Sequence, residues 1–417
     1  MTPLLISQSD TTGGAARAAF RLHQALLLSG VQSRMRVAEK KSDLHTVDGL
    51  QGKVAKALGL IRPSLGGQLM CLQKSPNKNF HSPSLLPSGL VKELNRSEAD
   101  VLNLHWINSE FLSIGDIARL RKPLVWTLHD MWAFSGAEHY GPVDDSARWR
   151  VGYRADNRPA GHGGMDIDRW VWGRKRKAWQ RPISIVTPSR WLAACAKASA
   201  LMHDWPVVAI PNPLDTGQYR PWPKEQARAL LGLPTSATLV LFGAIGGGKD
   251  PRKGWDLLQP ALESLAAQMF DVEGVIFGQS APFNPPRLGL PLHWMGHLND
   301  DVTLALLYSA ADVMVVPSRQ ENLPQSGTEA QACGCPVVAF NCTGLPDVVA
   351  HEETGYLAEP YDFEDLAKGI RWVLEDSERH SRLRAAARMR ALHLWSPEVV
   401  VPQYLKVYEA AIESHRK

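Results

Sequence analysis

The sequence predicts an α/β fold with two Rossmann-like, doubly wound parallel sheets, each in a domain of its own. Short apolar runs rich in β-branched residues alternate with helical patterns along all 417 residues. The runs are continuous rather than alternating in polarity, as expected of parallel strands buried on both faces. Ten runs are too many for one sheet of ordinary size, which indicates two sheets. The predicted strands are 3–7, 101–106, 123–130, 183–189, 207–213, 238–244, 273–278, 292–298, 312–318 and 336–341.

Helices are predicted between these strands. The first runs from about Ala15 to Leu28, has an alanine- and leucine-rich face, and is followed by Gly30, a common helix-ending residue. Five prolines in 211–235 predict a linker between two domains. We therefore expect a first domain over 1–214 and a second over 215–394. A last helix is predicted near Pro402–Glu413; periodicity does not place it, and we assign 395–417 to the first domain.

Composition excludes several classes of protein. The net charge of +4 is too small to indicate nucleic-acid binding by itself. No stretch of about 18 consecutive apolar residues predicts a membrane span, and the start "MTPLLISQSD" lacks the basic and apolar regions of a signal peptide. Five cysteines without a paired framework favour a reducing cytoplasm. Cys333 and Cys335 are interpreted as buried thiols, because a zinc site needs more ligands.

Ligands of open α/β sheets bind beyond the carboxyl ends of the strands, so two sheets that face each other would hold one ligand in a central cleft. After the first strand, Gly13 and Gly14 either let the backbone approach an anion at the helix start or form a plain turn. His129 and His105 each lie at the end of a predicted strand, where the chain turns toward the expected cleft. Either histidine can donate to a substrate, but the residue type alone favours a structural role, more strongly for His105.

The stretch 243–249 approximates a phosphate-binding P-loop. The match fails because Asp250 stands where a magnesium-binding Ser or Thr belongs, and Pro251 follows where the helix should continue. The sequence still predicts a Gly-rich loop that leads into a basic helix start. Such a loop could bind a diphosphate, or it could be a basic turn exposed to solvent. Its cations are Lys249, Arg252 and Lys253.

Residues 321–329, "ENLPQSGTE", place two carboxylates after the strand 312–318. Glu321 is predicted in the loop, Pro324 in the first turn of the next helix, and Glu329 in its second turn. The two carboxylates should then be farther apart than the roughly 5–9.5 Å of a glycosidase acid/base pair. Backbone N–H groups from 323 to 326 would point at an anion between them. The alternative is two ordinary surface glutamates.

Asp166-Ile167-Asp168 spells the D-x-D pattern that some sugar transferases use to hold a metal ion. The triplet is common by chance and follows no predicted strand, so no metal site is predicted.

Residues 148–181 are strongly basic, with ten Lys or Arg against three Asp, a local charge of 10 − 3 = +7. Tryptophans are interleaved, and Val171, Trp172, Ala178 and Trp179 share one helical face. Residues 169–181 would then contact an anionic membrane surface or a phosphorylated acceptor. The alternative is a helix with a core-facing apolar side and a solvated basic side.

With these motifs in place, the chain resembles the family-4 retaining glycosyltransferases of the GT-B architecture. The resemblance covers nearly the whole length and is densest from about 238 to 360. The segment "LHDMWAFSGAEHY" is similar to a subgroup that builds bacterial surface polysaccharides of the colanic-acid type. The matching motifs are Gly13-Gly14, "LHD" at 128–130, "TPSRW" at 187–191, "IPNPLD" at 210–215, "RKG" at 252–254 and the E-x7-E pattern from Glu321 to Glu329.

The resemblance implies a transferase that takes a sugar from a UDP- or GDP-sugar held mainly by the second, donor domain. Glu321 would meet the donor sugar, and Lys253 would neutralise the diphosphate. His129, from the acceptor domain, would reach the transferred sugar. Configuration would be retained without a metal or other cofactor. The implied donor-binding residues are Glu329 for the ribose, Arg252, Gly13 and Gly14 for the phosphates, Asn322, Leu323 and Pro324 near the sugar, and Gly278, His297 and Leu298 near the base.

The implied acceptor is a glycan or a lipid-linked saccharide, and the implied location is the cytoplasm, with peripheral contact at the inner face of the membrane. Ala244 departs from the arginine that many relatives carry there. Two other functions stay open: a non-catalytic nucleotide-sugar-binding or membrane-docking module, and a nucleoside-triphosphate hydrolase that uses 243–249.

Overall fold

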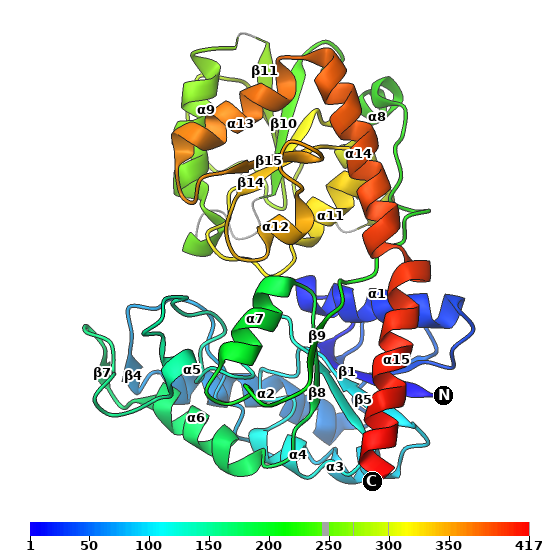
Figure 1. Cartoon of the computed structure of the whole chain (residues 1–417), viewed down its shortest axis with the longest axis vertical. Coiled ribbons are helices and arrows are strands. Elements are labelled where there is room, and N and C mark those ends of the chain that lie inside the picture. Colours follow the sequence, from blue (N-terminus) through cyan, green and yellow to red (C-terminus); the bar gives the residue numbers. More distant parts are fainter. Residues whose placement is uncertain (244–249, 270, 299, 417) are drawn as a thin grey trace. The chain divides into compact units, whose positions relative to one another are not determined.

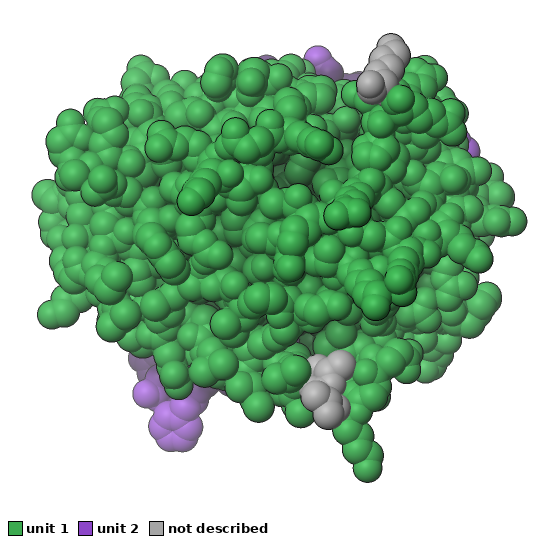
Figure 2. Space-filling view, turned by 90° about the horizontal axis from the view of Figure 1, so that it is seen from below, with its two compact units in different colours: residues 1–213, 400–417 green, residues 214–399 purple. Residues whose placement is uncertain are grey.

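The computed structural model describes residues 1–243, 250–269, 271–298 and 300–416. The chain divides into two compact units, Met1–Pro213 with Val400–Lys417 (unit 1) and Leu214–Val399 (unit 2), which Figure 2 colours separately. Each unit holds one parallel sheet with helices packed on it (Figure 1). The predicted fold class is confirmed: two doubly wound parallel sheets.

The seven-stranded sheet of unit 1 has the order β3-β2-β1-β5-β6-β8-β9. All neighbours pair in parallel; Leu5 of β1, for example, pairs with Met35 of β2 and with Asn103 of β5. A separate two-stranded antiparallel sheet joins β4 (Gln73–Lys74) and β7 (Gly163–Gly164). The main strands are β1 (Pro3–Ser9), β2 (Arg34–Glu39), β3 (Val47–Asp48), β5 (Val101–Leu104), β6 (Leu124–Thr127), β8 (Ser184–Thr187) and β9 (Val207–Ala209).

The helices of unit 1 bury apolar faces against this sheet. From Val400 on, the last helix contributes Tyr404 and Tyr408 to the same buried cluster as Leu5 and Leu22, and Asn103 Nδ2 donates to Tyr408 Oη at 2.8 Å. The helices are α1 (Gly14–Leu28), α2 (Lys53–Met70), α3 (Val91–Arg96), α4 (Ile114–Ala118), α5 (Arg148–Val151), α6 (Ile167–Ala178), α7 (Arg190–Ala198) and α15 (Pro397–Arg416).

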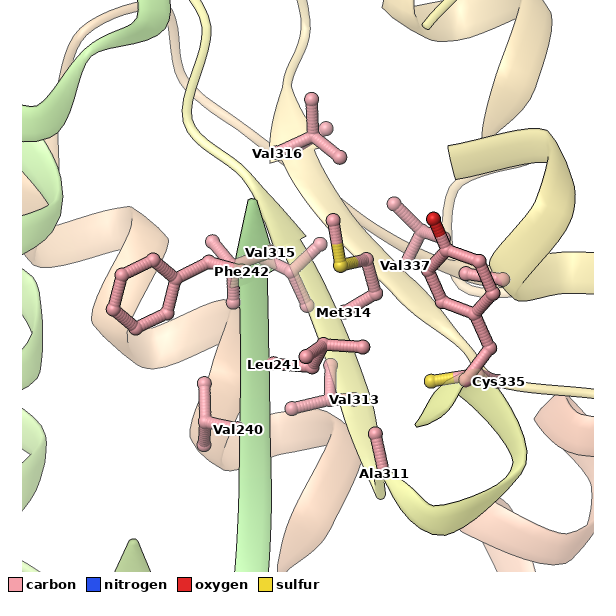
Figure 3. Packing of buried hydrophobic residues seen from close by; sticks show 14 of the residues in the cluster. Val240, Leu241, Phe242, Ala311, Val313, Met314, Val315, Val316, Cys335 and Val337 are labelled. Atoms are coloured by element: carbon pink, nitrogen blue, oxygen red, sulfur yellow. The ribbon is translucent and has the colours of Figure 1, made fainter. Parts of the chain in front are cut away.

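The six-stranded sheet of unit 2 has the order β12-β11-β10-β13-β14-β15, again parallel throughout. Leu241, Met314 and Val337 stand in register across its three central strands and are fully buried (Figure 3). The strands are β10 (Thr238–Gly243), β11 (Val272–Phe277), β12 (Leu292–Trp294), β13 (Val313–Val316), β14 (Val337–Phe340) and β15 (Gly355–Ala358).

Helices on both faces of this sheet complete unit 2 (Figure 1). They are α8 (Lys224–Leu231), the 3₁₀ turn η1 (Pro251–Lys253), α9 (Trp255–Ala266), α10 (Asp301–Ala310), α11 (Gln325–Ala332), α12 (Leu345–Val348), α13 (Phe363–Leu374) and α14 (Ser377–Trp395).

All ten predicted strands are present, but several end earlier than expected because their last residues already belong to the loops at the carboxyl edge. Five strands were missed: β2, β3, β4, β7 and β15. Their sequences are polar, glycine-containing or very short, and lack a long apolar run. The predicted helix near Pro402–Glu413 extends over Pro397–Arg416, with Pro402 inside it. Cys333 and Cys335 are free and buried, as predicted.

Of the helices in the described ranges, none combines the length and the hydropathy needed to cross a bilayer.

A buried ion pair fixes the start of β10 in unit 2. The Arg228 guanidinium, 1% exposed, donates to Asp312 Oδ2 at 2.7 Å and to carbonyls that include Ala310 and Ala237. The backbone N–H of Leu239 donates to the same carboxylate oxygen at 2.7 Å. The Asp312 carboxylate therefore neutralises the buried Arg228 cation and also accepts the backbone hydrogen bond at the start of β10.

Replacing Asp312 by Ala should lower the free energy of unfolding of unit 2 by about 3–5 kcal/mol, because the buried Arg228 charge loses its counter-ion. Denaturant titration measures this loss. The matched control is Glu378→Ala, which breaks the exposed α14 pair with Arg382 and should cost less than about 1 kcal/mol. Equal losses for the two variants would contradict the importance of the buried pair.

Candidate functional site

The loop after β13 carries the strongest candidate residues of unit 2. β13 is fully buried, so its polar continuation lies at the carboxyl edge of the sheet. Glu321, only 9% exposed, sits in this loop. Its backbone N–H donates to Thr343 Oγ1 at 3.1 Å, and its carbonyl accepts from Gly344 N at 3.0 Å. Glu321 is therefore not the loose surface glutamate of the alternative interpretation.

The segment that contains η1 lies directly against this loop. Gly254 has φ +66°, and a Cβ there would overlap the carbonyl oxygen of Pro317, so only glycine permits the approach. Arg319 N donates to Arg252 O at 2.7 Å, and the Arg319 guanidinium forms a two-point ion pair with Asp256. These contacts hold the basic turn and the carboxylate loop together.

Lys253 and Glu321 meet as an ion pair at this junction. Lys253 Nζ donates to Glu321 Oε1, and Ser318 Oγ lies 3.4 Å from the same oxygen. Arg252 is engaged elsewhere, because its guanidinium donates to Asp250 Oδ2 at 2.6 Å. Of the two cations predicted for the diphosphate, Lys253 is thus the one beside the candidate carboxylate. Ala244 and Lys249 lie outside the described residues, as does most of the P-loop-like stretch 243–249.

Glu329 occupies a different environment, in the second turn of α11 as predicted. It is 4% exposed, and Tyr308 Oη of α10 donates to its Oε2 at 2.8 Å. Burial, followed by the Glu329 charge, raises the pKa of the Tyr308 hydroxyl far above its ordinary value, so this group remains a donor. Glu321 and Glu329 therefore have separate partners on separate elements, which is not the arrangement of an acid and a base that share one bond.

Pro324 lies one position earlier than predicted: it is the N-cap of α11, with φ −66° and ψ 119°, and the helix begins at Gln325. Because proline has no backbone N–H, it cannot join the donors expected from 323 to 326. Asn322 and Leu323 are both buried. Gly344 lies so close that a Cβ would overlap the Asn322 carbonyl oxygen.

The three residues expected near the base lie in the loops that follow β11 and β12 of the same sheet. Gly278 follows β11 with φ +91°, and its N–H donates to Gly296 O at 2.8 Å. His297 is exposed, whereas Leu298 is partly buried against the core of unit 2. The strand ends thus place all three on neighbouring loops after β11 and β12.

In unit 1, two histidines meet at the carboxyl ends of the neighbouring strands β5 and β6. His105 Nδ1 and His129 Nε2 lie 3.0 Å apart, and the rings stack with centroids 5.3 Å apart. His105 is 3% exposed and His129 is partly buried. Burial lowers the pKa of His129 to about 4, against a smaller opposing effect of Asp130. Burial, followed by His129, also lowers the pKa of His105 far below its ordinary value.

Both histidines are therefore neutral near pH 7, and one ring nitrogen donates to the other. Asp130, next to His129, is fixed separately: it accepts from Trp106 Nε1 at 3.0 Å and contacts His139 Nδ1 at 2.6 Å. The sequence favoured a structural role for His105. In the structure His105 contacts the His129 ring, so that its structural role is to position His129. Its sequence position after a strand was the only signal for this pairing.

Gly13 and Gly14 lie at the carboxyl end of β1. Gly13 is the N-cap of the 15-residue helix α1, with φ 88° and ψ 168°. A Cβ at Gly13 would meet nothing within 4 Å, so the dihedral angle, rather than crowding within the chain, requires glycine there. Both residues are exposed at the start of α1.

The basic segment 148–181 matches the core-facing alternative. Val171, Trp172 and Trp179 are buried in the core of unit 1, so the aromatic face expected to enter a membrane is not on the surface. Lys175 is also fully buried, and its ammonium donates to the carbonyl oxygens of Gly136 and Ser135 at 2.7 and 3.1 Å.

The D-x-D aspartates also have structural roles. Asp166 caps α6 and pairs with Arg148, while Asp168 accepts from Gln73 Nε2 at 2.6 Å. Within the described ranges, no group of three or more His, Cys, Asp or Glu side chains is arranged to hold a metal ion.

Two family models match the chain. Residues 12–218 match the model described as Glycosyltransferase Family 4, and residues 247–390 match the model described as Glycosyl transferases group 1.

Curated relatives match about half of the chain. The D-inositol 3-phosphate glycosyltransferase of Segniliparus rotundus is 33% identical over 216 residues, which cover 49% of this chain and 46% of that protein. D-inositol 3-phosphate glycosyltransferase 1 of Catenulispora acidiphila is 35% identical over 220 residues, covering 49% and 51%. The chain spans about half the length of the curated relatives it matches.

Solved structures match over nearly the whole chain. A sucrose-phosphate synthase from Thermosynechococcus elongatus has a TM-score of 0.67 at 20% identity and covers 99% of both chains. HepE from Anabaena, solved in complex with UDP-glucose, has a TM-score of 0.65 at 18% identity and covers 98% of this chain and 100% of that one. At these identities the similarity shows the fold, which is GT-B.

The stability of unit 1 should fall as the pH is lowered from about 6.5 to about 4. The folded pKa of His129 is about 4, below its unfolded value of about 6.5. In this window the unfolded state binds more protons, and acid favours unfolding. Replacing His129 by Gln should flatten the slope by at most about 1.4 kcal/mol per pH unit. Denaturant titrations at several pH values measure it; the exposed control His203→Gln should keep the wild-type slope, and an unchanged slope in His129→Gln would contradict the neutral pair.

Proposed function

The chain belongs to glycosyltransferase family 4 of the GT-B fold, and from this we propose that it moves a sugar from a UDP- or GDP-sugar to a glycan or lipid-linked acceptor. The transfer would retain the anomeric configuration and would need no bound metal. The observation that carries the proposal is the carboxyl edge of the unit 2 sheet, where Lys253 meets Glu321 while Glu329 is held by Tyr308.

In this proposal Glu329 binds the ribose. Tyr308 Oη orients its carboxylate from one side, and carboxylate oxygens have further lone pairs that can accept from the two ribose hydroxyls. Because a buried carboxylate without partners is costly, the Tyr308 contact stabilises Glu329 before the donor arrives.

Lys253 would act on the leaving nucleoside diphosphate. Its side chain is 43% exposed, whereas that of Glu321 is 11% exposed, so the ammonium is the mobile partner of the ion pair. A bound diphosphate competes for this cation, and the negative charge on the leaving group grows as the glycosidic bond breaks. Glu321 would then be released toward the donor sugar. Arg252, held by Asp250, would contribute less.

Unit 1 would supply the groups that act on the sugar and acceptor. His129 is neutral and can donate a hydrogen bond to a sugar hydroxyl, and the exposed start of the 15-residue helix α1 at Gly13 and Gly14 suits the donor phosphates. The base would lie near Gly278, His297 and Leu298. Asn322, Leu323 and Pro324 would shape the sugar pocket.

The neighbours and relatives support parts of this proposal. The structure of HepE with UDP-glucose supports a uridine donor. The curated relatives are named for D-inositol 3-phosphate, whereas the segment "LHDMWAFSGAEHY" favours a surface polysaccharide. We retain the polysaccharide acceptor, which places the activity in the bacterial cytoplasm at the inner face of the membrane.

A non-catalytic nucleotide-sugar-binding module is the second candidate. Lys253 and Glu321 neutralise each other, as would also be expected of a binding site without turnover. Transfer or hydrolysis of the donor sugar by the purified protein would exclude this candidate.

Calorimetric titration with UDP and with GDP should detect binding of one nucleotide, and Glu329→Ala should weaken it roughly tenfold or more, because the ribose hydroxyls lose a charged acceptor. Tyr308→Phe should weaken it less, since it removes only the orienting hydroxyl. Glu353→Ala, an exposed glutamate of unit 2, is the control and should bind like wild type. Absence of binding by both nucleotides would refute the donor assignment.

Lys253→Ala should lower kcat about 10²- to 10³-fold with a smaller change in KM, because the charge it stabilises develops in the transition state. Transfer assays that follow release of the nucleoside diphosphate measure both constants. Arg252→Ala should lower kcat less. The matched control is Lys368→Ala, an exposed lysine paired with Asp365; a similar loss there would show that the effect is not specific to the site.

A further inference from the structure

Helix α2 of unit 1 exposes several large apolar side chains to solvent. Leu60 is 80% exposed, Ile61 52% and Leu65 48%, and none of the three belongs to a buried cluster of the unit. Isolated exposed leucines are common. Several on one helix indicate a surface that is covered by something else.

The opposite side of α2 explains why these side chains point outward. The helix approaches the unit closely at two glycines: a Cβ at Gly66 would crowd the Glu110 side chain, and a Cβ at Gly59 would crowd Leu50. Near its end, Leu69 and Met70 pack against the core of unit 1. A cavity of about 680 Å³ remains beneath the helix, between Leu58 and residues that include Leu90 and Phe111. Leu60, Ile61 and Leu65 are not among the residues that line it. Space exists on the inner side, yet these side chains face away from it.

The segment that contains α2 carries charge of one sign along the sequence. From Gly49 to Lys92 the sequence contains six Lys or Arg and no Asp or Glu. Lys53 and Lys56 on α2 are exposed, as are Lys74 and Lys78 just after it. Two further apolar side chains stand on this continuation, Leu72 at 51% and Phe80 at 56% exposed. Apolar side chains and cations are thus interleaved without a single carboxylate in the segment.

We propose that α2 and the segment 71–80 form a surface that docks on an anionic phospholipid membrane. Leucine, isoleucine and phenylalanine side chains would enter the boundary between headgroups and acyl chains, and the lysines would attract the anionic headgroups. A second copy of this chain is a poor occupant, because an isologous contact would bring the same cations together. The proposal concerns a different surface from the carboxyl-edge site and does not depend on transfer activity.

This surface replaces the membrane contact expected at 169–181. In α6, Val171 and Trp172 face the core. Trp170 is the one large apolar side chain of that helix that is exposed, and the Arg174 guanidinium lies over its ring. In α2, Leu60, Ile61 and Leu65 are themselves exposed. Membrane binding of a helix requires buried apolar area in addition to charge. Three exposed aliphatic side chains give α2 more apolar area to bury than the single Trp170 gives α6.

The experiment is co-sedimentation of the whole chain with vesicles of phosphatidylglycerol and phosphatidylcholine, and with vesicles of phosphatidylcholine alone. The wild type should bind the anionic vesicles more tightly, and salt should weaken the binding. The variant Leu60→Ser/Ile61→Ser/Leu65→Ser should lose roughly tenfold or more in partitioning. The control Leu28→Ser/Leu230→Ser/Leu394→Ser changes three other exposed leucines and should bind like wild type.

A second pair of variants tests the charges. One variant replaces four lysines of the surface by glutamine: Lys53→Gln/Lys56→Gln/Lys74→Gln/Lys78→Gln. It should lose most of the preference for anionic vesicles, since each lysine contributes about fivefold in affinity. Arg176→Gln/Lys177→Gln/Arg181→Gln changes exposed cations of 169–181 and should change binding by less than about twofold.

The proposal is overturned if the wild type does not bind anionic vesicles, if the α2 variants bind like wild type, or if the α6 variant loses as much. It is also overturned if light scattering shows that the wild type is a dimer and the apolar variant a monomer, while the two bind vesicles equally. Thermal unfolding and nucleotide titration of each variant exclude misfolding. A protein that binds vesicles but no nucleotide would refute the donor assignment and leave this surface standing.

Discussion

The candidate donor site depends on the close approach of Gly254 to the carbonyl of Pro317. A side chain at 254 would overlap that oxygen, so glycine sets how near the basic turn can come to the end of β13. The backbone bond from Arg319 N to Arg252 O and the Arg319–Asp256 ion pair then fix the approach. On the other side of the loop, Gly344 lies against the Asn322 carbonyl in the same way. The loop with Glu321 is therefore held between two glycine contacts, and Lys253 reaches the carboxylate as a consequence.

The two units differ in how they hold polar groups at their carboxyl edges. Unit 2 pairs opposite charges, Lys253 with Glu321, and gives Glu329 a neutral donor in Tyr308. Unit 1 holds His105 and His129 uncharged, because burial disfavours the imidazolium. A cation that can leave its partner suits a departing diphosphate, whereas a neutral imidazole suits a hydroxyl. This division supports the proposed donor binding by unit 2 and the proposed sugar contact from unit 1.

The same physical argument separates the two basic regions of unit 1. Both α2 and α6 combine cations with apolar residues in the sequence. α6 turns Val171 and Trp172 into the core and buries even Lys175, which is compensated by carbonyl oxygens. α2 approaches the unit at Gly59 and Gly66, and its apolar contact with the core comes from Leu69 and Met70 near its end. Leu60, Ile61 and Leu65 lie outside these contacts and are exposed to another partner.

The sequence by itself determined the strand and helix alternation, the two-sheet fold, and the position of Glu329 in the second turn of α11, because these follow from hydrophobic periodicity and short-range turn chemistry. It also indicated that Glu321, Lys253 and His129 leave strands at carboxyl ends, since parallel strands share one edge. Only the tertiary structure decided which residues meet there: Tyr308 with Glu329, Lys253 rather than Arg252 with Glu321, and His105 with His129. These pairs join residues 21, 68 and 24 positions apart, and no local pattern encodes such contacts. The tertiary structure also decided which basic helix shows its apolar face, because that depends on what each helix packs against.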